Sequence, residues 1–90
     1  GFLPHKKGRQ TKWLSIKDEE RTVVFYESPH RILKALEECV ELLGPDREVC
    51  VAREISKLYE EFKRGTAADV LAYYKAKPPK GEIVLMIKGK

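Results

Sequence analysis

The chain has 90 residues, of which 42% are hydrophobic and 36% are charged, and its formal net charge at pH 7 is +4. This length allows one domain, near the lower limit of what a single hydrophobic core can stabilise. The composition argues against a membrane protein, because apolar runs such as Ile83–Ile87 are far shorter than the roughly 20 residues of a membrane-spanning helix. No signal peptide is indicated, and without an initiator methionine we expect the chain to begin within a longer protein.

The two cysteines, Cys39 and Cys50, lie within a helical pattern and an apolar strand pattern respectively. Both positions favour small buried hydrophobic residues over a disulfide. Two isolated cysteines and two distant histidines do not form a zinc-ligand pattern, so we expect no metal site. These features predict a reduced, cytoplasmic domain.

The first elements in chain order are a loop, a helix and a strand. Gly1–Lys7 is expected to be a strand end that runs into a loop, and Gln10–Glu20 is a weak helix candidate. The β-branched and aromatic run Thr22–Tyr26 predicts a strand. Because the run lacks polar alternation, we expect it to be buried on both faces, as in a parallel sheet. Ser28 and Pro29 then indicate a helix start, with Ser28 as the N-cap and Pro29 at the first helical position.

The helix that follows is the best-defined element of the sequence. Its apolar residues recur close to the helical period on one face, at Ile32, Leu36, Cys39 and Leu43. Gly44 and Pro45 end this helix, with glycine in a left-handed turn. The run Glu48–Arg53 predicts a second buried strand. Strand, helix and strand within about thirty residues form a βαβ unit, whose two strands should be parallel.

The segment Glu54–Arg64 is ambiguous, because its apolar residues fit both a helical spacing and a strand alternation, with helix slightly favoured by periodicity. Gly65 is expected to break the segment, and Thr66 is expected to cap a short helix. The run Glu82–Ile87 predicts the last strand. Together these elements predict an α/β domain with a small mixed β-sheet, a βαβ unit and flanking helices.

Ligands of open α/β sheets bind at the carboxyl ends of the strands. Three such ends can be identified, namely Tyr26–Arg31, Ala52–Lys57 and the residues after Ile87. The first could bind an anion or a polar ligand at an exposed helix N-terminus. Composition alone favours the alternative, an ordinary capped helix in which Arg31 pairs with Glu27.

Several of these segments, taken together, carry a resemblance to a known family. They are Gly1–Pro4 with the basic stretch after it, Thr22–Arg31, Val51–Lys57, Glu60-Glu61, Arg64-Gly65 and Lys80–Leu85. In this order they resemble the C-terminal domain of ribosomal RNA small subunit methyltransferase I, within the tetrapyrrole methylase superfamily. The resemblance spans nearly the whole chain, and the block from Phe25 to Arg31 is its most specific part.

The resemblance implies that residues 1–90 form one domain, the C-terminal half of a two-domain enzyme whose N-terminal domain is absent. It implies S-adenosylmethionine in the cleft between the domains, and methylation of a cytidine ribose 2′-hydroxyl in small-subunit ribosomal RNA. The isolated domain would then be inactive, with its own N-terminal domain and ribosomal RNA as partners and a homodimer as a possible assembly. The alternative is a freestanding basic α/β module that binds RNA or a protein partner without a cofactor.

The resemblance also implies site residues. The positions that match the superfamily's adenosine contacts are Glu27, Ala52, Gly81 and Glu82, with Tyr26 as their neighbour. The segment that matches Leu58–Arg64 is extended in the superfamily, so we expect a strand over Tyr59–Lys63, against the helical periodicity.

The catalytic base stays open, because a base for the ribose hydroxyl could be any of several groups. The candidates are Glu27, His30, Glu54 and Lys57. Contacts with RNA phosphates are expected from Lys6, Lys7, Arg9, Arg31 and Arg53. If these contacts form, RNA binding should weaken steeply with salt.

Overall fold

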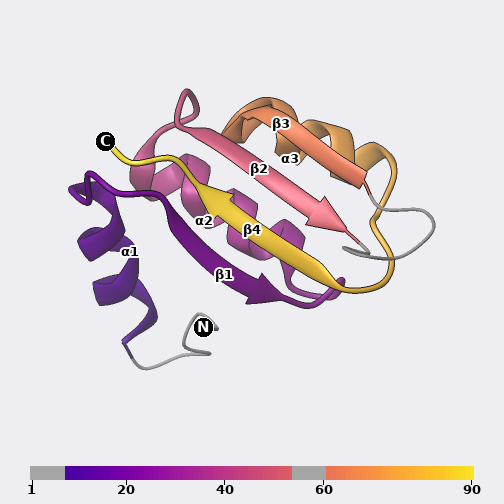
Figure 1. Ribbon diagram of the computed structural model, residues 1–90, viewed down its shortest axis with the longest axis horizontal. Helices are drawn as coiled ribbons and strands as arrows, with labels where there is room; N and C mark the ends of the chain where they lie inside the picture. The colour runs from indigo at the N-terminus through magenta and orange to yellow at the C-terminus, as the bar shows by residue number, and fades with distance from the viewer. Residues whose placement is uncertain (1–7, 54–60) are drawn as a thin grey trace.

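The computed structural model describes residues 8–53 and 61–90, which fold into three helices and four strands (Figure 1). The elements are α1 (Arg9–Lys17), β1 (Val23–Glu27), α2 (Ile32–Leu43), β2 (Glu48–Arg53), β3 (Glu61–Thr66), α3 (Ala67–Ala76) and β4 (Ile83–Ile87). The expectation for Gly1–Lys7 lies outside the described residues. The predicted α/β class is confirmed, and β2 has the predicted bounds.

The strands form one sheet in the order β1-β4-β2-β3, and each neighbouring pair is antiparallel. Strands β1 and β2 therefore run in the same direction, as predicted for the βαβ unit. They are not neighbours, however, because β4 lies between them and pairs with both (Figure 1). The sheet is thus antiparallel between neighbours, and the apolar β4 becomes an inner strand despite coming last in the chain.

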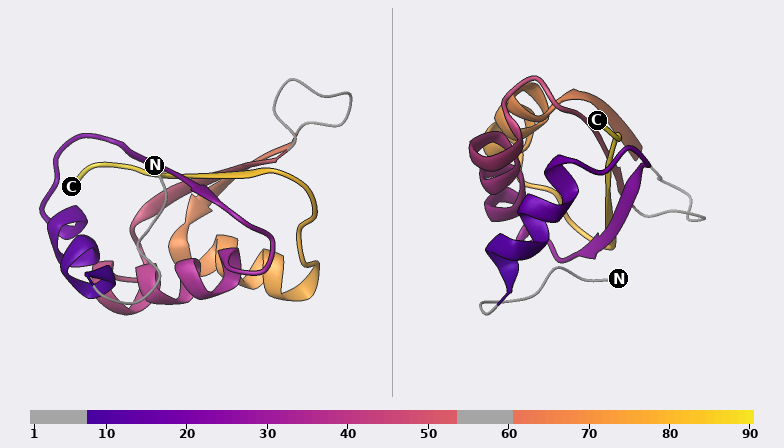
Figure 2. Two further views of the ribbon diagram at one scale, coloured as in Figure 1. Left: turned by 90° about the horizontal axis from the view of Figure 1, so that it is seen from below. Right: turned by 90° about the vertical axis from the view of Figure 1, so that its left-hand side faces the viewer.

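All three helices lie on one side of the sheet, so the domain has two layers (Figure 2). The core lies between the layers, where alternate sheet residues such as Phe25, Val51 and Leu85 are at most 3% exposed. The predicted apolar face of α2 packs there, since Ile32, Leu36 and Cys39 are fully buried, whereas Leu43, the fourth residue of that face, is half-buried. The amphipathic pattern of α2 thus selects the face that packs against the sheet.

The opposite face of the sheet carries no helix of the described residues (Figure 2). Val24, Tyr26 and Phe62 project from this open face and are 46%, 54% and 46% exposed. The expectation that the first strand is buried on both faces is therefore wrong. An antiparallel sheet can be covered on one face alone, whereas a sheet built from parallel crossovers normally has helices on both.

Helix α2 begins later than the sequence predicts. Its N-cap is Arg31, and no side chain caps it. Ser28 and Pro29 instead belong to a turn in which the Ser28 carbonyl accepts hydrogen bonds from the N–H groups of Arg31 and Ile32, both at 3.0 Å. The predicted helix end is correct at Gly44, but its φ of 106° and ψ of 150° differ from a left-handed helical turn.

The described part of the ambiguous segment Glu54–Arg64 is a strand. Residues 61–63 of the predicted strand Tyr59–Lys63 lie in β3, and residues 59 and 60 lie outside the described part of the chain. Gly65 does not break the segment, because it pairs with Val49 inside the strand. Thr66 caps α3 as predicted, since its Oγ1 accepts a hydrogen bond from the Asp69 N–H at 3.2 Å.

Helix α1 covers Arg9–Lys17, three residues shorter at its C-terminal end than the predicted Gln10–Glu20. Of the cysteines, Cys39 is fully buried and Cys50 is half-buried on the open face, and both thiols are free. Burial raises the pKa of the Cys39 thiol to about 11. No helix among the described residues is long and apolar enough to span a membrane.

Candidate functional site

The shared direction of β1 and β2 brings their carboxyl ends to the same end of the sheet (Figure 1). There, Glu27 of β1, Ile83 of β4 and Arg53 of β2 lie side by side in register. The neighbouring row contains Tyr26, Val84 and Ala52 in the same strand order. We call this end of the sheet the candidate edge. The third strand end of the sequence analysis, after Ile87, lies at the opposite end of the sheet, because β4 runs antiparallel to both.

The five residues that were matched to cofactor contacts all lie at the candidate edge, but they do not share one surface. Tyr26 and Ala52 belong to the row on the open face, whereas Glu27 alternates with Tyr26 and faces the helix layer. Gly81 and Glu82 immediately precede β4, between the ends of β1 and β2. The edge can therefore offer a ligand main-chain atoms from three strands, with side chains on either face.

Glu27 is the buried carboxylate of the candidate edge, with 8% of its surface exposed. Its Oε1 accepts a hydrogen bond from the N–H of Ser28 at 3.1 Å. Among the described residues no cation forms an ion pair with it. Buried carboxylates are normally paired or hydrogen-bonded several times, so this group retains acceptor capacity for a ligand that donates hydrogen bonds.

A hollow of about 360 Å³ lies over strands β1 and β4 near the candidate edge. It is lined by Val24, Tyr26, Glu82, Ile83 and Val84. Its lining is therefore mainly apolar, and the polar groups are the phenol of Tyr26 and the carboxylate of Glu82. This combination suits a flat, partly apolar ligand with polar substituents.

The loop from Lys77 to Glu82 places the start of β4 at the candidate edge. Pro78 and Pro79 have no N–H group to donate, and Gly81 has a φ of 81°, which a residue with a Cβ rarely adopts. The carbonyl of Lys80 accepts a hydrogen bond from Arg53 Nη1 at 2.8 Å. This contact ties the loop to the end of β2.

The residues that were expected to contact RNA lie in different environments. Arg9 is 6% exposed and pairs with Glu38, its Nε lying 2.7 Å from Oε1. Arg53 pairs with Glu61 at 2.9 Å. Arg31 is half-buried at the N-cap of α2, and Lys6 and Lys7 lie outside the described residues. The predicted contacts of these residues with RNA phosphates are not tested by this arrangement and stay a prediction.

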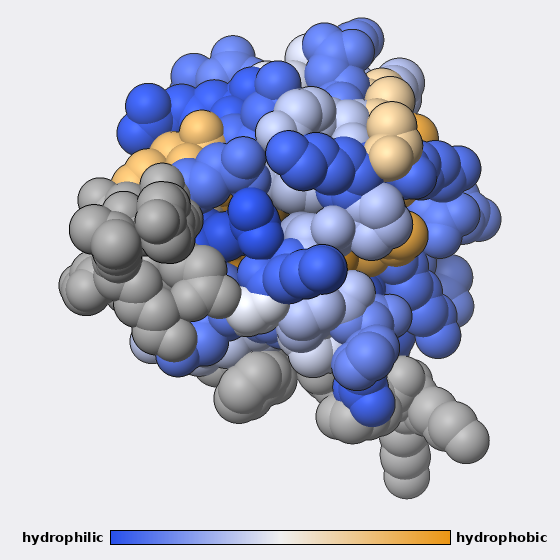
Figure 3. Space-filling view, turned by 90° about the vertical axis from the view of Figure 1, so that its right-hand side faces the viewer, coloured by the Kyte–Doolittle hydropathy of each residue, from blue (hydrophilic) through white to orange (hydrophobic). Residues whose placement is uncertain are grey.

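Two of the four candidate bases, Glu54 and Lys57, also lie outside the described residues. His30 is exposed in the turn before α2. Viewed from the end of the sheet that holds the candidate edge, the surface is mainly hydrophilic, with separate apolar patches (Figure 3). Among the described residues no group of three or more His, Cys, Asp or Glu side chains could hold a metal ion.

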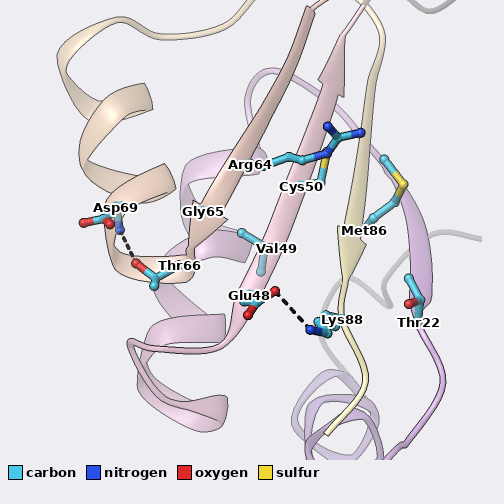
Figure 4. A pocket seen from close by; sticks show the side chains of 10 residues that line it. All are labelled: Thr22, Glu48, Val49, Cys50, Arg64, Gly65, Thr66, Asp69, Met86 and Lys88. Atoms are coloured by element: carbon cyan, nitrogen blue, oxygen red, sulfur yellow. Dashed lines mark hydrogen bonds and ion pairs between the residues drawn. The ribbon is translucent and has the colours of Figure 1, made fainter.

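A second hollow, of about 610 Å³, lies on the open face toward the other end of the sheet and was not found from the sequence. Figure 4 shows its lining, with the ion pair of Lys88 and Glu48 on one side and Arg64 on the other. Cys50 and Met86 form its apolar part. The sequence could not predict this hollow, because its lining comes from several paired strands and the sequence does not show which strands pair.

Fold and site together define an α/β domain with one open sheet face. Its candidate ligand groups come from two parallel strand ends and from the start of the antiparallel strand between them. Helices cover one face of the sheet at this edge, and the other face carries no helix of the described residues.

Curated relatives are consistent with this class. The chain is 44% identical over 90 residues to ribosomal RNA small subunit methyltransferase I of Thermotoga maritima, an alignment that covers 100% of the chain and 40% of that relative. It is 48% identical over 88 residues to the protein of that name from Erythrobacter litoralis, with 97% of the chain and 31% of the relative covered. The Escherichia coli O157:H7 protein of that name is 44% identical over 92 residues, with 99% and 32% covered. No protein-family model matches the chain.

The predicted resemblance is therefore confirmed: the chain matches the C-terminal domain of the ribosomal RNA small subunit methyltransferase I family over its whole length. It spans 31–40% of the length of the three relatives above.

Proposed function

We propose that this domain contributes one side of the S-adenosylmethionine site of a methyltransferase. The substrate would be a cytidine ribose 2′-hydroxyl of small-subunit ribosomal RNA. The relatives' names support the methyltransferase class and the ribosomal RNA substrate. The observation that carries the proposal is the assembly of Glu27, Ala52 and Gly81–Glu82 at one sheet edge by strands that are distant in sequence.

The residues of the edge fit the adenosine part of such a cofactor. The Glu27 carboxylate can accept hydrogen bonds from ribose hydroxyls or from an exocyclic amine. The hollow beside Tyr26 offers apolar surface for a flat base, and main-chain groups near Gly81 can come close because this residue has no side chain. When bound, the cofactor supplies the activated methyl group, and the domain's own contribution is to hold and orient it.

A further part of the polypeptide completes the site in this proposal. The relatives are longer than the aligned region, which leaves room for a second domain. The open face, with Val24, Tyr26 and Phe62 exposed, is the apolar surface that such a domain would cover. The isolated domain is then inactive, because the transferred methyl and its acceptor need both sides of the cleft.

Cofactor binding gives the direct test. In the polypeptide from the complete reading frame, we expect S-adenosylhomocysteine to bind, and Glu27→Gln to weaken it about tenfold or more. The physical reason is that the variant loses a buried negative acceptor while its shape is kept. Isothermal titration calorimetry measures both affinities.

The matched control is Glu37→Gln, which removes an exposed carboxylate of α2 that is not among the residues of the candidate edge. We expect its affinity to equal that of the unmodified protein. Absence of binding to the unmodified protein would refute the proposed function. Equal affinities for Glu27→Gln and the control would remove Glu27 from the site.

Binding of ribosomal RNA gives a second test, which asks whether basic side chains of the domain contact RNA phosphates. We expect the affinity for a small-subunit ribosomal RNA fragment to fall linearly on a log–log plot against salt, because bound cations release counterions from RNA. Arg31→Gln should weaken binding and lower the magnitude of that slope by about one. Filter binding at several salt concentrations measures the slope. A slope near zero would mean that phosphates do not contribute.

A further inference from the structure

Beside the candidate edge, on the helix side of the sheet, four polar side chains form a closed cluster. Arg53 Nε donates to Glu61 Oε1 at 2.9 Å, and the same oxygen accepts from the Tyr74 hydroxyl at 3.0 Å. Glu61 Oε2 accepts from the Tyr73 hydroxyl at 3.2 Å. The cluster joins β2, β3 and α3, and through Arg53 Nη1 it also reaches the Lys80 carbonyl at 2.8 Å.

The two charged groups of this cluster, Arg53 and Glu61, form an ion pair with each other. The Arg53 side chain is 19% exposed and that of Glu61 is 31% exposed. The Arg53 guanidinium and the two tyrosine hydroxyls hold the pKa of Glu61 below its usual range, against the opposing effect of burial. Both carboxylate oxygens of Glu61 therefore accept hydrogen bonds within the cluster. The Arg53 guanidinium donates through Nε to Glu61 and through Nη1 to the Lys80 carbonyl. This arrangement is more typical of a structural clamp than of a phosphate contact.

The loop that Arg53 holds has few other means of fixing its backbone. Two successive prolines remove two N–H donors, and Gly81 adds conformational freedom that the folded loop must give up. Pro79 is buried and anchors the middle of the loop. The bond from Arg53 to Lys80 lies between this anchor and Gly81, so it restrains the residues that enter the candidate edge.

We propose that Arg53 is a positioning residue. By holding the Lys80 carbonyl against the end of β2, it fixes the main chain of Gly81 and Glu82 between β1 and β2. The link to cofactor binding rests on the proposed function, whereas the restraint of the loop follows from the cluster itself. Arg53 thus acts on a ligand through the loop and does not bind RNA.

The first measurement follows the loop directly, by amide hydrogen exchange in the NMR spectrum of the 90-residue chain. In Arg53→Met we expect exchange at Gly81 and Glu82 to quicken about tenfold or more, because the charge-assisted bond to Lys80 is lost. Exchange at Leu85, in the centre of β4, should stay unchanged. Arg53→Lys should give the same pattern, since one ammonium group cannot reproduce the two-sided contact of the guanidinium.

The matched control is Lys63→Met, which removes a cation that lies 4.5 Å above the Tyr73 ring and, among the described residues, forms no hydrogen bond with the loop. We expect loop exchange in this variant to equal that of the unmodified chain. If Arg53→Met does not fold, Arg53→Lys and Glu61→Gln carry the test. Unchanged exchange at Gly81 and Glu82 in a folded Arg53 variant would overturn the proposal.

The second measurement separates positioning from RNA contact in the polypeptide from the complete reading frame. Arg53→Lys should weaken S-adenosylhomocysteine about tenfold and leave the RNA affinity and its salt dependence unchanged. A weaker RNA affinity with unchanged S-adenosylhomocysteine affinity would overturn the proposal in favour of a phosphate contact. If the unmodified protein binds no S-adenosylhomocysteine, the proposed function fails, and the exchange measurement alone decides whether Arg53 restrains the loop.

Discussion

Replacement of Trp13 by alanine is expected to lower the free energy of unfolding by about 3–5 kcal/mol. Trp13 belongs to α1 and is fully buried, and the centre of its ring lies 6.4 Å from that of Phe25 at a tilted angle. The loss combines the transfer of a large apolar side chain with the cavity that remains. Since domains of this size are only marginally stable, we expect Trp13→Ala to be largely unfolded at 25 °C. Urea denaturation followed by circular dichroism measures the change.

Two further variants make this result specific. Leu14, the neighbouring residue of α1, is 50% exposed, and Leu14→Ala should change the stability by no more than about 0.5 kcal/mol. Trp13→Phe should cost less than Trp13→Ala, because it keeps an aromatic ring and removes a buried indole N–H that has no hydrogen-bond partner among the described residues. Equal stability of the two Trp13 variants would contradict a packing role for the ring.

Replacement of Arg47 by methionine is expected to lower the stability by about 2 kcal/mol. This arginine lies between α2 and β2 and donates to three main-chain carbonyls. Its Nη2 and Nη1 bond the last carbonyls of α1, those of Ile16 and Lys17, each at 3.1 Å, and its Nε bonds the Lys88 carbonyl at 2.8 Å. The side chain thus caps one helix and ties it to the end of β4, where a cation also meets the negative end of the helix dipole.

The control for Arg47 is Arg21→Met, which removes a side chain that is 87% exposed and pairs with Glu19. An exposed ion pair of this kind is screened by water, so we expect no measurable loss of stability. Thermal and urea unfolding of both variants provide the comparison. An equally small effect for Arg47→Met would show that water replaces its three bonds without loss.

Much of the element pattern could be predicted from local sequence. The helical spacing of Ile32, Leu36 and Cys39 identified the buried face of α2, because burial follows the helical period. The start of α2 was misjudged, since Ser28 and Pro29 are equally suited to a tight turn and nothing local distinguishes the two. The strand in the ambiguous segment came from the resemblance, because its apolar spacing fitted both structures.

The candidate site was predicted only as separate strand ends. The residues matched to cofactor contacts do meet at one edge, but the sequence could not show that Tyr26 and Glu27 face opposite sides of it. It also could not show that Arg53 is held by Glu61 and the Lys80 carbonyl. Arg9 and Arg53 each pair with a glutamate, and their contact with RNA phosphates stays a prediction.

The α/β class, the buried face of α2 and the bounds of β2 could be predicted from the sequence, because they depend on periodicity and on residues close in the chain. The strand order β1-β4-β2-β3 could not be predicted and is seen only in the folded domain. That order depends on pairing between segments far apart in sequence, and local patterns carry no record of which strands become neighbours. By placing β4 between β1 and β2, it brings Gly81 and Glu82 to the candidate edge and leaves one face of the sheet open.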